Sequence, residues 1–352
     1  MIRVLITEDS PVIRGYLEYL LNSDPDIEVV GTAKDGTEAV EMVALKKPDV
    51  VTMDIHMPKM DGFEATRKIM ETNPVPIVIV SASWNPDEVD KTFRTMEAGA
   101  VAALEKPRGI GHPESETSVK ELIQTVKLMS EVKVVRRWAS LRKMKPVIEP
   151  VKEEKAEPKT SDLDIKLVAI GASTGGPLVL QNILSRLPEN FPVPIGIVQH
   201  IAPGFLPGLG EWLNKTTNFP VHIASKGMHL LPGNAYLAPD GFQMGVDKSC
   251  RVVLGTKKPE HNLCPSVSYF FRSVANNLGK KSIGVLLTGM GKDGAAELKL
   301  LKEKGGLTIA QNKESSVVHG MPGEAIKLGA AKYVLPPDKI AEKLKNLIIK
   351  KK

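Results

Sequence analysis

Short apolar runs alternate with amphipathic stretches along most of this chain, and this alternation restricts the folds that it can adopt. The short runs are typical of buried strands, and each is followed by a stretch whose apolar residues have helical spacing. Strands that alternate with helices favour a parallel sheet covered by helices on both faces. We therefore expect an α/β fold with a five-stranded parallel sheet in residues 1–130. Its strands are expected near 2–7, 27–31, 49–53, 76–80 and 100–104, and its helices near 11–22, 36–46, 62–71, 86–98 and 117–132.

The alternation stops near residue 131 and resumes after residue 163. The segment between them contains three prolines among lysines and glutamates, a composition that cannot build an apolar core. A chain of 352 residues is long enough for about two domains. We therefore predict one domain over 1–130, a flexible charged linker over 131–163 and a second domain over 164–352. Trp138, within the linker, is expected to pack on a domain surface.

The second domain is expected to be a doubly wound, mostly parallel α/β fold with a small antiparallel excursion. Gly171 is expected to end its first strand, and the several short strands within 220–256 are expected to form the excursion. The other strands are predicted at 167–170, 193–199, 282–288, 307–311 and 333–335, and the helices near 177–187, 205–215, 265–278, 294–304, 322–329 and the C-terminus.

Charge and composition disfavour several classes of protein. The net charge is +6, and seven basic residues lie between Lys127 and Lys145. Charge in a linker is usually solvated, and no helix-turn-helix or aromatic stacking pattern accompanies it, so nucleic-acid binding is not expected. No run approaches the roughly 18 apolar residues of a membrane span, and no signal peptide precedes the first strand. Cys250 and Cys264 are expected to be reduced thiols, so we expect a cytoplasmic protein without direct membrane insertion.

Polar residues follow four strands of the first predicted sheet. Glu8 and Asp9 follow the first strand, Asp54 the third, Ser81 the fourth and Lys106 the fifth. Because the carboxyl ends of parallel strands meet at one edge, these side chains are expected to converge there, although each alone would be read as a surface charge or a helix cap. Three converging carboxylates repel each other unless a divalent cation lies among them, and oxygen ligands suit Mg²⁺. Asp54 can then act as a nucleophile toward a phosphoryl group, whose oxygens Lys106 and Ser81 would contact.

These residues resemble the motifs of response-regulator receiver domains, over the whole first domain. The resemblance implies that a histidine kinase phosphorylates Asp54. One position departs from the family, which often has an aromatic switch residue three positions before the lysine, where this chain has Ala103. The matching residues are Glu8-Asp9, Asp54, Met57-Pro58, Asp61-Gly62, Ser81-Ala82 and Lys106-Pro107.

A glycine-rich turn at 171–177 joins the first strand of the second domain to a helix. Pro177 suits a first helical turn, and Gly175 and Gly176 would leave the N–H groups of the helix open to a substrate. A strand–turn–helix of this kind is a common way to present a serine nucleophile, which would be Ser173. Two alternatives remain at this point: Ser173 is only a helix cap, or the glycines hold a phosphate.

Two further polar residues follow strands of the same predicted sheet, His200 after 193–199 and Asp293 after 282–288. A serine nucleophile needs a base, and the base needs an acid that orients it. Taken singly, His200 could be a strand-end histidine bonded to the backbone and Asp293 a helix cap, but together with Ser173 they favour a catalytic triad. The loop at 289–294 offers the N–H groups of Met290 and Gly291 to an oxyanion.

The second domain resembles the CheB family of chemotaxis-type protein-glutamate methylesterases, and the order of receiver, linker and catalytic domain agrees. The resemblance implies hydrolysis of glutamate methyl esters on chemoreceptors, deamidation of some receptor glutamines, an acyl-enzyme intermediate and no cofactor for the esterase reaction. It also implies that Thr174 helps to hold His200. The residues that carry it are Gly171-Ala172-Ser173-Thr174-Gly175-Gly176-Pro177, Gln199-His200, Pro203-Gly204-Phe205 and Leu287-Thr288-Gly289-Met290-Gly291-Lys292-Asp293-Gly294.

One motif departs from this family. Where the family often has Arg-Pro-Ser-Val-Asp, this chain has Cys264-Pro265-Ser266-Val267-Ser268, and the change is expected to alter charged contacts at the rim of the site. Cys264 is expected to be a packed or partly exposed thiol. The preferred function is a phosphorylation-activated serine hydrolase of this family. The alternatives are a phosphoryl acceptor or binding regulator with a weakly active hydrolase domain, and a hydrolase of small esters.

Overall fold

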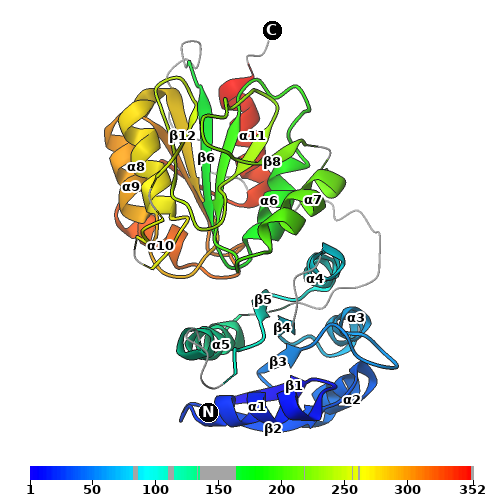
Figure 1. The fold of residues 1–352 in the computed structure, drawn as a ribbon. Helices are drawn as coiled ribbons and strands as arrows, with labels where there is room; N and C mark the ends of the chain where they lie inside the picture. Colours follow the sequence, from blue (N-terminus) through cyan, green and yellow to red (C-terminus); the bar gives the residue numbers. More distant parts are fainter. Residues whose placement is uncertain are drawn as a thin grey trace, which may run out of the picture.

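The computed structural model describes residues 1–81, 86–109, 115–132, 134, 164–217, 219–255, 257–260 and 262–349, with side chains at all of these except 86–90. The interpretation of Trp138 and most of the expected linker therefore lie outside the described residues. The described strands form two parallel sheets, each with its own helices, and one small antiparallel pair (Figure 1).

The first sheet has five parallel strands in the order β2-β1-β3-β4-β5, as the alternation predicts. Helices α2, α3 and α4 pack on one face, while α1 and α5 cover the other. Side chains of Ser10, Asp35 and Asp61 cap α1, α2 and α3 by accepting N–H groups of the first turn. The strands are β1 (Ile2–Thr7), β2 (Ile27–Ala33), β3 (Val50–Met53), β4 (Ile77–Ser81) and β5 (Ala102–Glu105), and the helices are α1 (Pro11–Asn22), α2 (Gly36–Lys46), α3 (Gly62–Thr72), α4 (Pro86–Ala98) and α5 (Ser115–Ser130).

The second sheet has seven parallel strands in the order β14-β13-β12-β6-β7-β9-β8. Strands β6, β7, β12 and β13 are buried along their whole length, because helices cover both faces. The strands are β6 (Leu167–Ala172), β7 (Ile195–Gln199), β8 (Val221–Ile223), β9 (Ala235–Leu237), β12 (Ser282–Leu286), β13 (Leu307–Gln311) and β14 (Tyr333–Leu335).

Two expectations for this sheet need correction. Gly171 does not end the first strand, because β6 continues through it and pairs with both neighbours as far as Ala172. The antiparallel excursion is smaller than expected, since β8 and β9 join the main sheet in parallel. Only β10 (Met244–Val246) and β11 (Val252–Leu254) form an antiparallel pair among the described strands.

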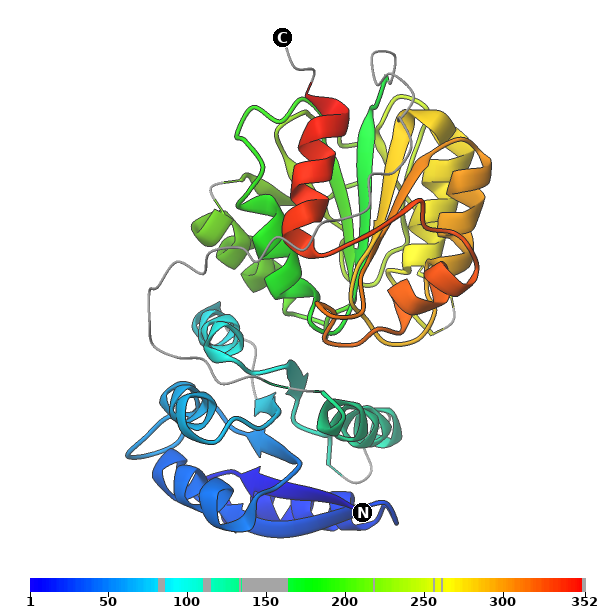
Figure 2. The same ribbon diagram turned by 180° about the vertical axis from the view of Figure 1, so that it is seen from behind.

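Helices form one layer on each face of the second sheet. Figures 1 and 2 show α6, α7 and α11 on one side and α8, α9 and α10 on the other. Their bounds are α6 (Gly176–Leu184), α7 (Leu206–Thr217), α8 (Val267–Asn277), α9 (Ala295–Glu303), α10 (Met321–Lys327) and α11 (Pro337–Ile348), with a short 3₁₀ turn, η2 (Gly279–Lys281), before β12. None of the described helices is both long and apolar enough to span a membrane.

The two sheets come into contact through the helices α4, α6 and α7 (Figure 1). The Phe93 ring of α4 stacks on Trp212 of α7 with centroids 4.9 Å apart and meets the edge of Phe205 at 6.4 Å. The Gln181 side chain of α6 donates a hydrogen bond of 2.8 Å to Glu97 of α4. Aromatic burial of this kind stabilises a contact beyond its area alone.

A second contact involves the segment that follows β13. Val317 and Val318 pack against the apolar cluster that β5 and α5 build with the first sheet. This segment, residues 312–320, therefore lies between the first domain and the loops at the carboxyl edge of the second sheet.

Candidate functional site

Ser173 stands immediately after the central strand β6 of the second sheet. The Ser173 N–H donates to the Thr288 carbonyl at 3.0 Å, and the Ser173 carbonyl accepts the Gly176 N–H at 2.8 Å, which closes a tight turn into α6. Gly175 has φ +78°, a left-handed conformation that favours glycine. The strand–turn–helix predicted for Ser173 is therefore present, and the Ser173 side chain is partly exposed.

The two glycines of this turn make room for protein side chains. A Cβ at Gly175 would lie 2.6 Å from Val317, and a Cβ at Gly176 would lie 2.1 Å from the Gln199 amide oxygen. We expected these glycines to leave the helix N-terminus open to a substrate. Both positions instead face packed side chains, so packing explains glycine at Gly176 and adds to the left-handed backbone as a reason for glycine at Gly175.

His200 and Asp293 come together beside this turn. The strands β12, β6 and β7 are neighbours, so the segments after them meet at one edge, as the sequence predicts. The His200 Nε2 lies 2.9 Å from Asp293 Oδ2, and both side chains are largely buried. Because Nε2 faces the carboxylate, Nδ1 is the imidazole nitrogen that Asp293 does not engage.

Asp293 is held at the N-terminus of α8. The Val267 N–H donates to Asp293 Oδ2 at 2.7 Å, and the Ser266 hydroxyl and the Ser268 N–H donate to Oδ1 at 2.9 and 3.0 Å. Burial alone would raise the pKa of Asp293, but the hydrogen bonds from His200 and Ser268 outweigh it and hold the pKa well below its usual range. The carboxylate therefore keeps its charge, which an acid that orients a histidine requires.

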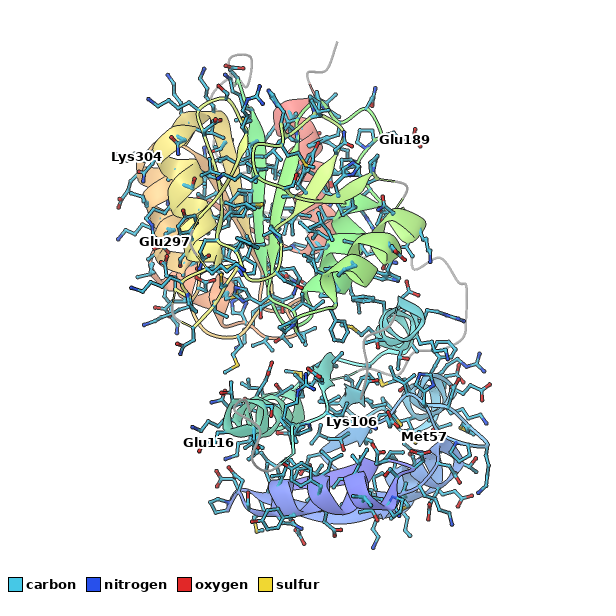
Figure 3. The ribbon with its side chains drawn as sticks, viewed as in Figure 1. Met57, Lys106, Glu116, Glu189, Glu297 and Lys304 are labelled. Carbon is cyan, nitrogen blue, oxygen red and sulfur yellow. The ribbon has the colours of Figure 1, made fainter. Side chains whose placement is uncertain are left out.

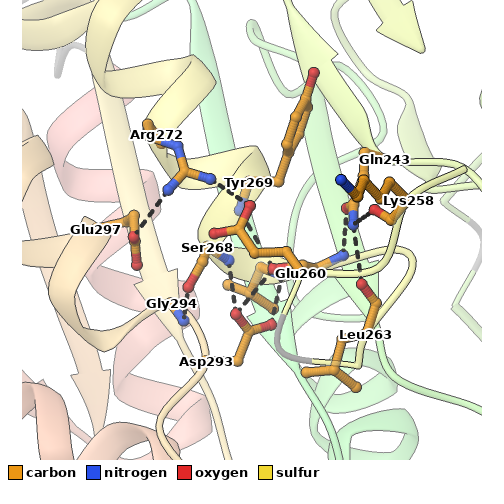
Figure 4. Close-up of polar contacts among 12 residues, drawn as sticks. Gln243, Lys258, Glu260, Leu263, Ser268, Tyr269, Arg272, Asp293, Gly294 and Glu297 are labelled. Atoms are coloured by element: carbon orange, nitrogen blue, oxygen red, sulfur yellow. Dashed lines mark hydrogen bonds and ion pairs between the residues drawn. The ribbon is translucent and has the colours of Figure 1, made fainter. Parts of the chain in front are cut away.

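Ser268 occupies a different place from the one we expected. It is buried rather than at a rim, and its hydroxyl accepts the Gly294 N–H at 2.9 Å while its own N–H binds Asp293 (Figure 4). Farther along α8, Arg272 forms ion pairs with Glu260 and Glu297, which join α8 to a loop and to α9. Cys264 is a free, partly buried thiol whose pKa is raised by burial.

The loop that follows β12 carries the two candidate oxyanion donors. Gly291 has φ +78°, and within the described part of the chain neither the Met290 nor the Gly291 N–H donates a hydrogen bond. The 312–320 segment shapes this loop from the other side. The Gly289 N–H donates to the Val318 carbonyl at 3.0 Å, and the Gly320 N–H donates to the Gly289 carbonyl at 3.1 Å.

Thr174 makes its described hydrogen bond through the backbone. Its carbonyl accepts the Thr288 hydroxyl at 2.9 Å, and that hydroxyl also contacts the main chain of Val318. A role for Thr174 in holding His200 stays a prediction.

The carboxyl edge of the first sheet brings its predicted residues together. Lys106 Nζ lies 2.7 Å from Glu8 and 3.2 Å from Asp54, and the Ile55 N–H donates to Asp54 at 2.8 Å. Burial raises the pKa values of both Asp54 and Glu8. The nearby Lys106 ammonium lowers both pKa values but does not outweigh burial. Lys106 lies on the receiver side of the molecule in Figure 3.

This acidic edge fits a divalent cation. Oxygen atoms of Glu8, Asp9 and Asp54 lie within 4.8 Å of one another, and such a set of hard ligands suits Mg²⁺. The buried Ser81 hydroxyl has no hydrogen-bond partner in the described structure, so it is free to meet an incoming oxygen. Ala103 packs against the apolar core.

Sequence reasoning missed two residues of the second site. Gln199 appeared only within a family motif, although its buried amide contacts the main chain of both Ser173 and His200. Ser266 appeared only in a motif that departs from the family. A serine immediately before the amphipathic helix is an N-cap signal, and it could have indicated that this helix begins beside another group.

Comparisons with known proteins identify the family of both domains. The family model for CheB methylesterase matches residues 168–344, and that for the response regulator receiver domain matches residues 4–112. The protein-glutamate methylesterase/protein-glutamine glutaminase of Nitrosospira multiformis is 56% identical over 348 residues, which are 99% of this chain and 97% of the relative. A protein of the same name from Syntrophus aciditrophicus is 55% identical over 349 residues, 99% of this chain and 98% of that one.

A solved structure agrees as well. The crystal structure of the Thermotoga maritima CheB methylesterase catalytic domain covers 52% of this chain and 99% of its own, with 42% identity and a TM-score of 0.50. Full-length relatives and matches to both domains lead to one conclusion: this chain belongs to the CheB family of methylesterases that carry a response-regulator receiver domain.

Proposed function

We propose that this chain is a protein-glutamate methylesterase and protein-glutamine glutaminase that acts on chemoreceptors and is activated by phosphorylation of its receiver domain. The observation that carries the proposal is the His200–Asp293 pair, 2.9 Å apart, beside the Ser173 turn. The names of the full-length relatives support both activities.

The geometry supports an acyl-enzyme mechanism. His200 takes the Ser173 proton at Nδ1 while the Ser173 oxygen attacks the ester carbonyl of a methylated glutamate. Asp293 stabilises the imidazolium that forms, because four hydrogen bonds keep its charge in place. The imidazolium then gives this proton to the leaving methoxy oxygen, or to the leaving nitrogen of a glutamine amide, as the bond from that atom to the carbonyl carbon breaks and methanol or ammonia departs. A water molecule, deprotonated by His200, hydrolyses the acyl-enzyme to a free glutamate and releases Ser173.

The developing oxyanion needs donors that make no other bond. Among the described residues, the N–H groups of Met290 and Gly291 donate no other hydrogen bond, and they lie in the loop that follows Gly289. Gly289 itself approaches Ser173 closely, since a Cβ there would lie 2.6 Å from the Ser173 Cβ. Removing one oxyanion donor typically raises a barrier by about 2.7–4 kcal/mol.

The receiver would control this site through the contacts of α4 with α6 and α7. A histidine kinase would transfer a phosphoryl group to Asp54, with Lys106 and Ser81 contacting its oxygens. Mg²⁺ bound by Glu8, Asp9 and Asp54 would neutralise charge during the transfer. A phosphoryl group adds a charge near −2, which would change the ion pairs of Lys106 and weaken the docked arrangement. The two free cysteines are consistent with a cytoplasmic location.

Methanol release from methylated receptor membranes tests the proposal. The wild-type chain is expected to release methanol, Ser173→Ala is expected to release none above background, and Asp54→Asn is expected to keep basal release but to lose stimulation by a small phosphodonor with Mg²⁺. Equal release by wild type and Ser173→Ala would exclude Ser173 as the nucleophile. Normal phosphorylation of Asp54 with no hydrolysis by the wild type would instead favour a phosphoryl acceptor with an inactive hydrolase domain.

A further inference from the structure

The strands β6 and β7 separate where the candidate site begins. Their parallel pairing ends at Ala172 and Gln199, and one more backbone bond follows, from the His200 N–H to the Ala172 carbonyl at 2.9 Å. Beyond this point the chain turns into α6 on one side and into the 201–205 loop on the other. His200 thus makes the last backbone bond between the two strands, and Ser173 lies just past it.

The Gln199 side chain continues the bonding beyond that point. Its Nε2 donates to the Ser173 carbonyl and to the His200 carbonyl, each at 2.8 Å. A primary amide has two N–H donors, so both are used. The amide orientation is unambiguous, because carbonyls only accept and the nitrogen must face them. Gln199 is buried, so no water competes for these bonds.

From this bridge we propose that Gln199 is a positioning residue that sets the distance between the nucleophile and its base. This inference rests on the hydrolase function proposed above and assigns a new role within it. The base nitrogen, Nδ1, is separated from the His200 main chain by only two side-chain atoms, Cβ and Cγ. Its position therefore depends strongly on the backbone that Gln199 holds.

The rest of the turn is built around this amide. The Gln199 Oε1 is buried without a hydrogen-bond partner in the described structure, and it lies against the first residue of α6. A Cβ at Gly176 would lie 2.1 Å from this oxygen, so only glycine leaves space for it. An unpartnered buried oxygen is costly, and such a cost is tolerated where the other end of the group has a function. Gly176 is thus the complement of Gln199.

The test compares full-length variants in the methanol-release assay. Gln199→Met keeps the length of the side chain and removes both donors. Thr308→Val is the matched control, because Thr308 is also buried, also bonds a main-chain carbonyl (Ala330, 2.7 Å), and lies at the opposite end of its strand. Ser173→Ala measures the background.

Gln199→Met is expected to lower kcat about 10–100-fold with KM within about twofold, because a small misplacement of reacting groups is costly and Gln199 does not reach the substrate. The rate at which a fluorophosphonate labels Ser173 should fall by the same factor. Thr308→Val should lower the melting temperature but leave kcat within about twofold. A Gln199→Met kcat equal to that of Thr308→Val would overturn the proposal.

Gly176→Ala gives a second and independent test, and it decides the matter if Gln199→Met does not fold. Gly176 has helical backbone and is expected to accept alanine, whose methyl group would displace the Gln199 amide. The same selective loss of kcat is expected, and an unchanged kcat would contradict the positioning role. If the wild type itself released no more methanol than Ser173→Ala, the proposed function would fail. This outcome differs from an unchanged kcat in Gln199→Met or Gly176→Ala, which would contradict only the positioning role.

Discussion

Asp54 and Asp293 are buried to almost the same degree, with 4% and 6% of their surface exposed, yet their pKa values move in opposite directions. Both lie beyond strands at the carboxyl edge of a parallel sheet. Asp54 accepts one N–H and shares Lys106 with Glu8, so burial prevails and raises its pKa. Asp293 accepts three donors from α8 and faces His200, and these lower its pKa despite burial.

The difference shows that the number of donors, rather than burial, decides what a buried carboxylate can do. Asp54 has incomplete compensation, which suits a group that must take up a cation and a phosphoryl group and so change its charge. Asp293 has nearly complete compensation, which suits a group whose charge must stay constant through each turnover. We call the carboxyl group of Asp54 in the first domain the variable charge, and the carboxylate of Asp293 in the second domain the constant charge.

The largest expected effect comes from removing the constant charge. Asp293→Asn keeps the size of the side chain but cannot stabilise an imidazolium, so kcat for ester hydrolysis is expected to fall by about 10⁴. Asp247→Asn is the control, because hydrogen bonds from Arg251 and Ser249 N–H groups also lower the pKa of that carboxyl, away from the site. Comparable activity in the two variants would mean that the charge of Asp293 has no role in turnover.

A smaller effect is expected where the two regions meet. If the variable charge acts on the second site through the docked helices, Phe93→Ala should raise basal methanol release several-fold without a phosphodonor, because it removes the stack on Trp212. Trp212→Ala removes the same contact from the other side and should act in the same direction. Tyr19→Ala, which truncates an exposed ring on α1, should change nothing. Unchanged basal activity in both interface variants would contradict control through this contact.

The smallest effect is on stability, and it has opposite signs at the two carboxylates. The raised pKa of Asp54 makes its ionised form costly once the pH exceeds the ordinary carboxyl pKa of about 3.9, so Asp54→Asn should melt higher than wild type at pH 7 without metal. The lowered pKa of Asp293 contributes stability above that pH, which is lost as the pH falls through its folded-state pKa, so Asp293→Asn should melt lower at pH 7.

Calorimetry from pH 4 to 8 in EDTA checks both signs. Each kcal/mol corresponds to about 2–8 °C in domains of this size range. The Asp54 difference should shrink toward pH 4, whereas the Asp293 difference should stay nearly constant down to pH 4, because that stability is lost only at lower pH. Mg²⁺ should raise the melting temperature of the wild-type receiver more than that of Asp54→Asn. If Asp54→Asn and Asp293→Asn both raised or both lowered the melting temperature at pH 7, the opposite pKa shifts inferred for the two carboxyls would be contradicted.

The sequence predicted the α/β fold and the approach of His200 and Asp293 beside the turn that carries Ser173, because both follow from a simple rule. Periodic apolar spacing separates strands from helices, and parallel strands bring their carboxyl ends to one edge. Any polar residue just after such a strand is therefore placed almost by topology alone. The same rule placed Glu8 and Asp54 of the receiver.

Features that depend on packing were not predictable in this way. Gly171 lies within a strand rather than at its end. Glycine is needed there because a Cβ would lie 2.3 Å from Val267, and this contact joins distant parts of the chain. Strands β8 and β9 are only three residues long, too short for periodicity to give their partners. Gln199 is one polar residue in an apolar strand, and only the folded structure shows which carbonyls it meets.

The position of the segment 312–320 has a consequence for how the rate of demethylation depends on the density of receptors. Val317 and Val318 pack on the receiver, while the backbone of Val318 bonds the loop beside Ser173, so the docked receiver and an incoming receptor helix would occupy neighbouring surface. Where two partners exclude each other, each shifts the equilibrium of the other by the same factor. A receptor helix that needs the surface on which the receiver is docked would displace the receiver by mass action, and a dense receptor array would then be demethylated faster per molecule than a sparse one at the same level of phosphorylation.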